Sequence, residues 1–201
     1  MPKVVDHELR RRELAGAVWR VIRRDGVEGA SVRAVAGEAG WSPGALRHYF
    51  TTQSELLAFA MRLVVERVEA RVARLEPAVD PREAVEQRLH QLLPLDDERR
   101  AENEVWLAFT GRALIDPELR ALHNEVHDAL HEACVSAVEA PNALGTTSAG
   151  LDAALEAERL HALLDGLAVH AALRSNLLPA ERLVAILRGH LDALEGRTRR
   201  D

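Results

Sequence analysis

Apolar residues recur every three to four positions through almost all of the 201-residue chain, and this spacing limits the possible fold more than any other feature. It places apolar side chains along one face of an α-helix. A β-strand would need apolar and polar residues in alternation between turn signals, and strand signals of this kind are absent. Hydrophobic residues make up 47% of the chain, enough to fill one or two buried cores. The sequence therefore predicts an all-α fold.

Helix-start and helix-stop residues divide the chain into segments. The favourable N-cap residues are Ser31, Ser42, Asp80 and Asp116, and proline follows the last three. Thr52 and Glu55 form a capping box, and Gly26 can end the first helix. Residues 140–150 are rich in Pro, Gly, Ser and Thr, which predicts a mobile surface loop. We expect helices at about residues 6–24, 32–39, 43–50 and 52–75, from 81, and at 97–114, 117–139, 151–175 and 179–194.

A tight glycine turn at residues 39–41 separates two short expected helices, which is the pattern of a helix-turn-helix. The second helix, in "SPGALRHYF", has small residues in its first turn, so its backbone can approach phosphates and base edges. Leu46 and Phe50 lie four positions apart and would anchor it. Arg47–Tyr49 would then face DNA. A compact helical corner without a partner has the same pattern.

Charge is distributed unevenly along the chain. Residues 1–50 hold nine Lys and Arg against six Asp and Glu, whereas the remaining residues hold 17 against 26. A basic end on an acidic protein suits a head that binds a polyanion, although a solvated surface would explain it equally well. Arg10, Arg11 and Arg12 are expected to form a flexible arm that contacts the DNA backbone or minor groove.

The segment "GASVRAVAGEAGWSPGALRHYFTTQSELL", residues 29–57, resembles the DNA-binding head of TetR-family transcriptional regulators. The resemblance implies a DNA-binding domain at residues 1–52 and an effector-binding and dimerisation domain at residues 53–201. The family often has a phosphate-contacting lysine near the start of the fourth helix, where this chain has Gln53. The expected DNA contacts are Ser31, Arg33, Ser42, Pro43, Gly44, Ala45, Arg47, His48, Tyr49 and Gln53.

Residues 93–126 resemble, more loosely, the regulatory half of the branch typified by the choline-responsive repressor BetI. Aromatic residues are scarce in this part of the chain, so an aromatic cage for a choline-like cation does not follow from the sequence. We expect a small organic effector, and an uncharged or acidic one is as plausible as a cation. The expected pocket residues are Phe59, Trp106, Phe109, His127 and Leu164, which could equally be plain core.

The helix expected at residues 151–175 is apolar nearly all round, and the final helix can cover only one of its faces. A second copy of the chain would supply the missing cover through a four-helix interface. A central helix in a monomeric body is the alternative. In the TetR family this helix pair forms the dimer, so the resemblance implies a homodimer here. The expected interface residues are Leu160, Leu163, Gly166, Leu167, Leu187 and Leu191.

Three histidines at four-residue spacing, His123, His127 and His131, are the strongest enzyme-like signal. They span about 12 Å along a helix, too far for one ion to hold all three. His123 and His127 could share a metal, so a metal-dependent helical enzyme remains an alternative. A dimeric interaction protein is another. Glycine-rich phosphate loops, nucleophile elbows and cysteine clusters are absent, so we expect no enzyme activity, no cofactor and no metal.

The function that we expect is that of a ligand-responsive transcriptional regulator, a homodimeric repressor released from a palindromic operator by its effector. The DNA partner is double-stranded. Apolar runs of 18 residues are absent, and arginines occupy the opening segment where a signal peptide would be apolar. The protein is therefore expected to stay in the cytoplasm without a membrane partner.

Overall fold

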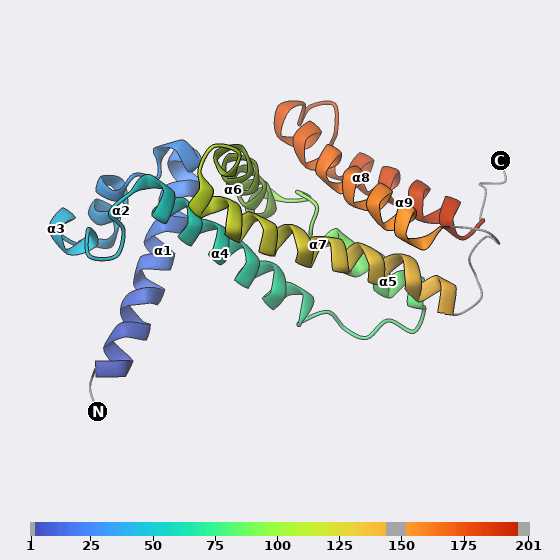
Figure 1. Ribbon diagram of the computed structural model, residues 1–201, viewed down its shortest axis with the longest axis horizontal. Coiled ribbons are helices and arrows are strands. Elements are labelled where there is room, and N and C mark those ends of the chain that lie inside the picture. The colour runs from blue at the N-terminus through green and yellow to red at the C-terminus, as the bar shows by residue number, and fades with distance from the viewer. Residues whose placement is uncertain (1–2, 144–151, 197–201) are drawn as a thin grey trace. The chain divides into compact units, whose positions relative to one another are not determined.

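The structure is a computed structural model that describes residues 3–143 and 152–196, and regular structure in these ranges is entirely helical (Figure 1). The all-α prediction is confirmed. The helices are α1 Lys3–Gly29, α2 Val32–Ala39, α3 Pro43–Leu46, α4 Gln53–Val72, α5 Pro81–His90, α6 Asp97–Ala113, α7 Pro117–Ala143, α8 Ala153–Leu173 and α9 Ala180–Leu194. Within the described residues, none of these helices is long and apolar enough to cross a membrane.

The chain forms two compact units. Unit 1 contains the residues up to Arg67 together with Glu104–His123, and unit 2 contains Val68–Asn103 and the residues from Asn124 onward. Unit 1 therefore extends beyond the boundary expected at residue 52. It includes α1 to α3, most of α4, the second part of α6 and the beginning of α7.

The core of unit 1 begins with α1. The apolar stripe predicted for this helix is buried, and α1 packs against α2 while α2 packs against α3. Gly26 has a positive φ of 74°, so the expected stop appears as a kink, and a short helical continuation reaches Gly29. Trp19 lies beneath the Arg67 guanidinium of α4, 4.0 Å from the ring centroid, a cation–π contact between the two helices. The buried stripe consists of Leu14, Ala17, Val18, Val21 and Ile22.

The predicted helix starts are confirmed by side-chain hydrogen bonds. Ser31 accepts from Ala34 N and Asp80 accepts from Arg82 N. Thr52 accepts from Glu55 N at 3.1 Å, and the Glu55 carboxylate accepts from Thr52 N, which completes the capping box. These interactions join residues no more than three positions apart, so the local sequence contains all the information that they require.

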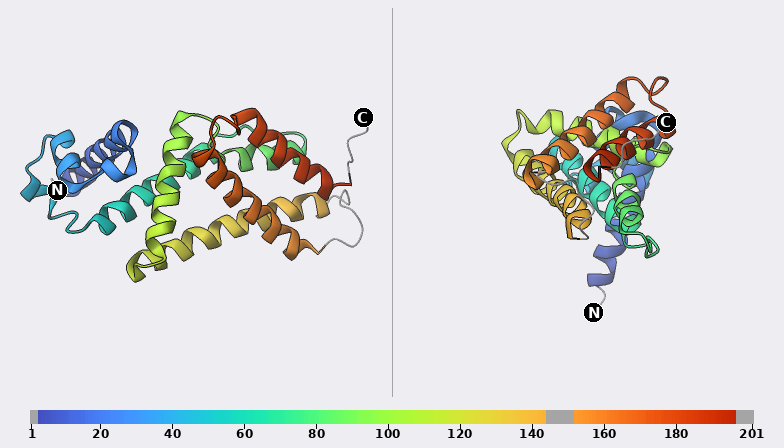
Figure 2. Two further views of the ribbon diagram at one scale, coloured as in Figure 1. Left: turned by 90° about the horizontal axis from the view of Figure 1, so that it is seen from above. Right: turned by 90° about the vertical axis from the view of Figure 1, so that its right-hand side faces the viewer.

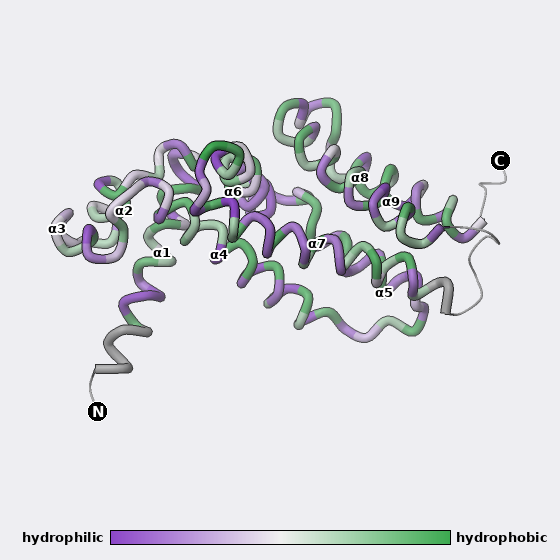
Figure 3. The backbone as a smooth tube through the Cα atoms, in the orientation of Figure 1, coloured by the Kyte–Doolittle hydropathy of each residue, from purple (hydrophilic) through white to green (hydrophobic). Residues whose placement is uncertain are grey.

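The core of unit 2 lies between α5, α7, α8 and α9. Helices α8 and α9 lie side by side (Figures 1 and 2), and each carries both hydrophobic and hydrophilic stretches (Figure 3). Cys134 of α7 is fully buried in this core, and burial raises the pKa of its thiol to about 12, so the thiol stays protonated and unreactive.

Two expectations about mobile segments need correction. Arg10, Arg11 and Arg12 lie within α1 and form no flexible arm, and Arg11 pairs with Glu66 of α4 at 3.0 Å. Helix α7 continues to Ala143, past its expected end at residue 139 and into the expected loop. The rest of that loop, from residue 144, lies outside the described residues.

Candidate nucleic-acid interface and regulatory body

The turn between α2 and α3 has the geometry that a helix-turn-helix requires. Gly40 ends α2 in the left-handed conformation with φ 68°, and Trp41 N donates to Ala36 O at 2.9 Å. Ser42 accepts from Ala45 N at 3.1 Å and begins α3, with Pro43 in its first turn. Regular helix ends at Leu46, earlier than expected.

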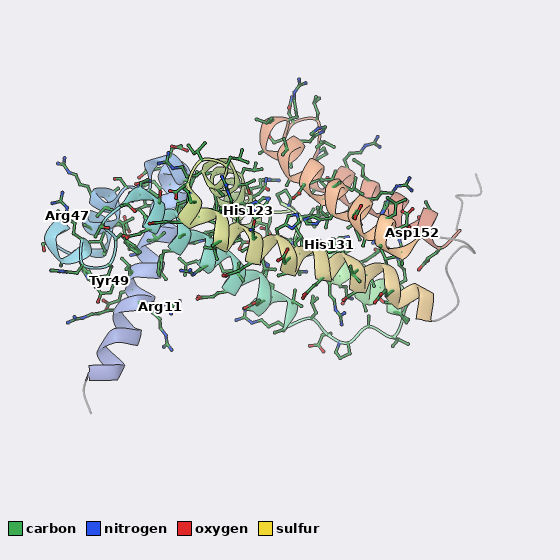
Figure 4. All side chains as sticks on the ribbon, viewed as in Figure 1. Arg11, Arg47, Tyr49, His123, His131 and Asp152 are labelled. Carbon is green, nitrogen blue, oxygen red and sulfur yellow. The ribbon has the colours of Figure 1, made fainter. Side chains whose placement is uncertain are left out.

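The side chains of α3 and the turn after it divide into buried anchors and exposed groups. Leu46 and Phe50 are buried, and the Phe50 ring lies 5.1 Å from the Phe59 ring of α4, centroid to centroid. Arg47 and His48 are exposed (Figure 4 labels Arg47), as are the four residues at 42–45. Arg47, His48 and residues 42–45, which were predicted to face DNA, are therefore exposed.

Tyr49 is the member of this predicted set with a second role. It is half-buried (Figure 4 labels Tyr49), and its ring lies 5.4 Å from the Trp41 ring in a tilted arrangement, so it helps to pack the turn. Any DNA contact from Tyr49 must come from the part of the side chain that remains exposed.

Three predicted contacts lie outside residues 42–50, and their side chains differ in how exposed they are. Arg33 on α2 is exposed. Ser31 is half-buried, and its hydroxyl is engaged in capping α2. The Gln53 amide donates from Nε2 to Ala30 O at 2.9 Å, which ties the start of α4 to the residue just before that cap. Gln53 still has a second amide N–H and an oxygen for other partners.

Glu38 of α2 was not recognised from the sequence as part of the head's electrostatics. It accepts hydrogen bonds from Arg20 at 2.6 Å and Arg24 at 2.7 Å, and these bonds hold its pKa below the usual range. Two of the basic side chains that gave the head its positive balance are therefore engaged within it. The positive charge available to DNA is smaller than the residue count implies.

The residues expected in the effector pocket are divided between the units. Phe59, Trp106 and Phe109 belong to unit 1, whereas His127 and Leu164 belong to unit 2. Phe109 is 0% exposed and is core. The half-buried Trp106 ring stacks on His123, 5.4 Å between centroids and 13° from parallel. Aromatic stacking of this kind gives His123 a packing role.

His127 belongs to a cluster of imidazoles in unit 2 that the sequence did not reveal. Its ring lies 4.5 Å from that of His161 on α8, and the His131 ring lies 5.9 Å from His161 (Figure 4 labels His131). His161 is only 5% exposed, and burial lowers its pKa although the nearby Asp165 carboxylate acts in the opposite direction. In the described residues, no three His, Cys, Asp or Glu side chains form a group that could hold a metal ion.

The residues expected at the dimer interface separate by burial. Leu160, Leu167, Leu187 and Leu191 are buried within a single chain, in the core of unit 2. Leu163 and Gly166 are half-buried, and a Cβ built on Gly166 would meet nothing within 4 Å. On the same face of α8, Val169 is 39% exposed and Leu173 is 76% exposed.

The chain resembles known proteins over almost its whole length. Residues 15–60 match the family described as "Bacterial regulatory proteins, tetR family", and residues 81–195 match "BetI-type transcriptional repressor, C-terminal". The HTH-type transcriptional regulator PksA of Bacillus subtilis is 41% identical over 195 residues, covering 96% of this chain and 94% of that protein. The regulator BetI of Vibrio atlanticus is 30% identical over 199 residues, covering 96% and 94%.

Solved structures agree with these sequence matches. A transcriptional regulator from Rhodococcus sp. Rha1 superposes with a TM-score of 0.76 at 34% identity, covering 92% of this chain and 95% of that one. A regulator from Saccharomonospora viridis, solved in complex with choline, superposes with a TM-score of 0.81 at 24% identity, covering 92% and 96%, and so shows the same fold.

The α2–α3 turn and the two family matches define the class of protein. It is a helix-turn-helix transcriptional regulator with a ligand-binding C-terminal domain. The chain belongs to the TetR family, and its C-terminal domain is of the BetI type. The two predicted resemblances are confirmed. Because its relatives regulate transcription, they give no support to the alternative of a metal-dependent enzyme.

Proposed function

We propose that the protein is a homodimeric repressor that binds a palindromic operator and is released from it by a small organic effector. The observation that carries the proposal is the turn directly after α3, where Arg47 and His48 are exposed while Leu46 and Phe50 anchor the segment. Two copies related by two-fold symmetry would present two such helices about 34 Å apart, or somewhat more, along the major groove. The protein would act in the cytoplasm, where its DNA is.

The DNA contacts proposed are the exposed residues of the α2–α3 region. Arg47 is the best-placed side chain for reading a base edge, because a guanidinium can donate two parallel hydrogen bonds to guanine. Arg33 and the backbone N–H groups at the start of α3 would contact phosphates. Gln53 would provide a neutral phosphate contact through its second amide N–H.

The effector is proposed to bind in the BetI-type domain. Choline is the first compound to test, because a neighbour of the same fold was solved in complex with it. The chain has seven aromatic residues in all, three Trp, three Phe and one Tyr, which argues against an extensive aromatic cage. Uncharged and acidic organic molecules form the second class to test. An effector releases DNA only by binding the two conformations with different affinities.

A pulldown of genomic DNA fragments by the purified protein tests the proposed function. The expected result is a small set of fragments that share a palindrome, with specific retardation of the protein's own promoter region. Retardation that is equal for all sequences at every salt concentration would contradict operator recognition and favour the dimeric interaction protein. Genes beside the recovered fragments would narrow the choice of effector.

A further inference from the structure

The corner between α6 and α7 is a compact hydrogen-bonded turn. Asp116 accepts through Oδ1 from Glu118 N at 3.1 Å and so begins α7. Arg120, one turn into α7, donates from Nη2 to Leu114 O at 2.7 Å and from Nε to Ala113 O at 3.3 Å. These carbonyls are at the end of α6, where a cationic donor is favourable. Arg120 therefore links the start of α7 to the end of α6 by two hydrogen bonds.

The second oxygen of Asp116 reaches a helix far away in the sequence. The Ser54 hydroxyl, in the first turn of α4, donates to Asp116 Oδ2 at 2.6 Å. Both residues are half-buried, and both belong to unit 1. The Ser54 hydrogen bond lowers the pKa of Asp116, so the carboxylate is ionised at neutral pH and the bond is charge-assisted.

The first turn of α4 is joined in turn to the DNA-binding head. Gln53, the neighbour of Ser54, donates to Ala30 O, and Ala30 precedes the Ser31 cap of α2. The capping box of Thr52 and Glu55 makes this turn of α4 a locally well-ordered unit. A displacement at Asp116 would thus reach the start of α2 through two consecutive hydrogen bonds.

We infer that the Ser54–Asp116 hydrogen bond is the contact by which the α6–α7 corner sets the position of α4, and with it the DNA-binding competence of the head. Ser54 and Asp116 are positioning residues, because they act on DNA through Gln53 and the helix-turn-helix. Helix α7 is continuous from Pro117 to Ala143. An effector that shifts α7 would therefore also shift Asp116, which caps the start of this helix. This inference goes beyond the proposed repressor function by naming the link between effector and DNA binding.

The first experiment measures DNA affinity of the full chain, at one fixed salt concentration, on a promoter fragment that the wild type retards. Ser54→Ala removes the bond but leaves the Asp116 cap intact, and we expect about 5- to 50-fold weaker binding at a temperature at which both proteins are fully folded. Ser54→Thr keeps a hydroxyl and should restore affinity. A purely structural hydrogen bond would instead lower the melting temperature and leave affinity unchanged, which would overturn the inference.

The second experiment is a double-mutant cycle with a matched control. Asp116→Ala removes both the bond and the helix cap, whereas Asp80→Ala removes only an equivalent cap, at the start of α5. We expect Asp80→Ala to keep full DNA affinity and Ser54→Ala to have no further effect in the Asp116→Ala background. Fold-losses that multiply in the double variant would show that the two residues act separately, and would overturn the inference.

Amide hydrogen exchange without DNA separates this inference from the repressor proposal. Asp116→Ala and Ser54→Ala should accelerate exchange in residues 51–58, whereas Asp80→Ala should not. Unchanged exchange in that segment would contradict a positioning role even if DNA binding were intact. A wild type that binds no DNA fragment would contradict the repressor proposal, while the exchange comparison would still decide whether Asp116 holds α4.

Discussion

Arg47 is the side chain that we propose to read a base edge of the operator. Its side chain is exposed directly after Leu46, whose complete burial fixes the backbone from which the guanidinium extends. A long flexible side chain can read a base edge only if its backbone is held in place. Leu46 and Phe50 provide that support, so Arg47 can distinguish sequences and not merely add positive charge.

Arg47→Ala is expected to reduce operator selectivity by roughly 1–3 kcal/mol, the usual cost of losing a bidentate contact with guanine. The measurement is the ratio of specific to non-specific affinity at one fixed salt concentration. Equal weakening on all sequences would make Arg47 a phosphate contact. Arg100→Ala, which removes an exposed arginine of unit 2, is the control for loss of charge. Unchanged affinity on both kinds of DNA would remove Arg47 from the interface.

At the scale of helices, the features that the sequence predicted are those determined within a few residues. The caps at Ser31 and Asp80 and the Thr52–Glu55 box depend only on neighbours along the chain. Contacts between distant segments could not be predicted in the same way, because many pairings of helical faces satisfy the same periodicity. The hydrogen bond of Gln53 to Ala30 and the His127–His161 contact are of this kind.

The dimer residues illustrate the same limit. Periodicity indicated two apolar faces on α8, but it could not say which face the chain itself would cover. Packing against α5, α7 and α9 buries the face containing Leu160 and Leu167. The face containing Gly166 and Val169 is the one left open. The predicted arm at Arg10–Arg12 failed because polar residues can extend a helix whose core begins only at Leu14.

Helices α5 and α9 are joined by a buried arginine whose removal should be costly. Arg82 of α5 is 7% exposed, and its guanidinium lies 3.0 Å from Asp192 and 3.4 Å from the buried Glu195 carboxylate. Arg82→Ala would remove a buried positive charge from its ion pairs with Asp192 and Glu195, and we expect the free energy of unfolding to fall by about 3–5 kcal/mol. Urea denaturation followed by circular dichroism measures this change.

Arg188→Ala is the matched control for that experiment, because Arg188 pairs with Glu86, as Arg82 also does, but is largely exposed. An exposed ion pair contributes about 0–1 kcal/mol, so this variant should unfold close to the wild type. Equal destabilisation by both variants would mean that burial at Arg82 does not determine the strength of the α5–α9 connection.

The whole molecule should lose stability in mild acid because of its buried and half-buried histidines. Burial lowers the pKa values of His90, His161 and His190, so the folded protein binds fewer protons than the unfolded chain once the pH falls below about 6.5. Protonation therefore favours unfolding. The urea concentration at the unfolding midpoint should decrease as the pH is lowered from 7.5 to 5.5. The carboxylates whose pKa values are lowered, such as Glu38 and Asp116, add to this loss only at lower pH.

Replacing one buried histidine isolates its share of the acid effect. His161→Gln removes the titrating group from the centre of the imidazole cluster, so the midpoint should depend less steeply on pH than in the wild type. His170→Gln, at an exposed position later on α8, should leave the pH dependence unchanged. A pH dependence that is the same in all three proteins would exclude His161 as a source of the acid sensitivity.

Assembly of two chains can be tested at Gly166, because the single chain has room for a side chain there. A Cβ at this position meets no atom within 4 Å, so Gly166→Leu should leave the fold of one copy intact and gain helix propensity of about 1 kcal/mol. Leu163, Val169 and Leu173 extend the open apolar face on either side. If a second copy packs against that face, the leucine should separate the helices and yield monomers.

Sedimentation velocity of Gly166→Leu, with helicity checked by circular dichroism, measures that outcome. The expected result is a fully helical monomer whose operator affinity is greatly reduced, because a single head can contact only one half-site. Gly189→Leu is the control, since Gly189 on α9 also has open space around its Cβ position. It should dimerise normally if α8 supplies the central contact. A helical Gly166→Leu dimer with an unchanged association constant would place the interface elsewhere, because no close backbone approach at Gly166 could accommodate the added side chain.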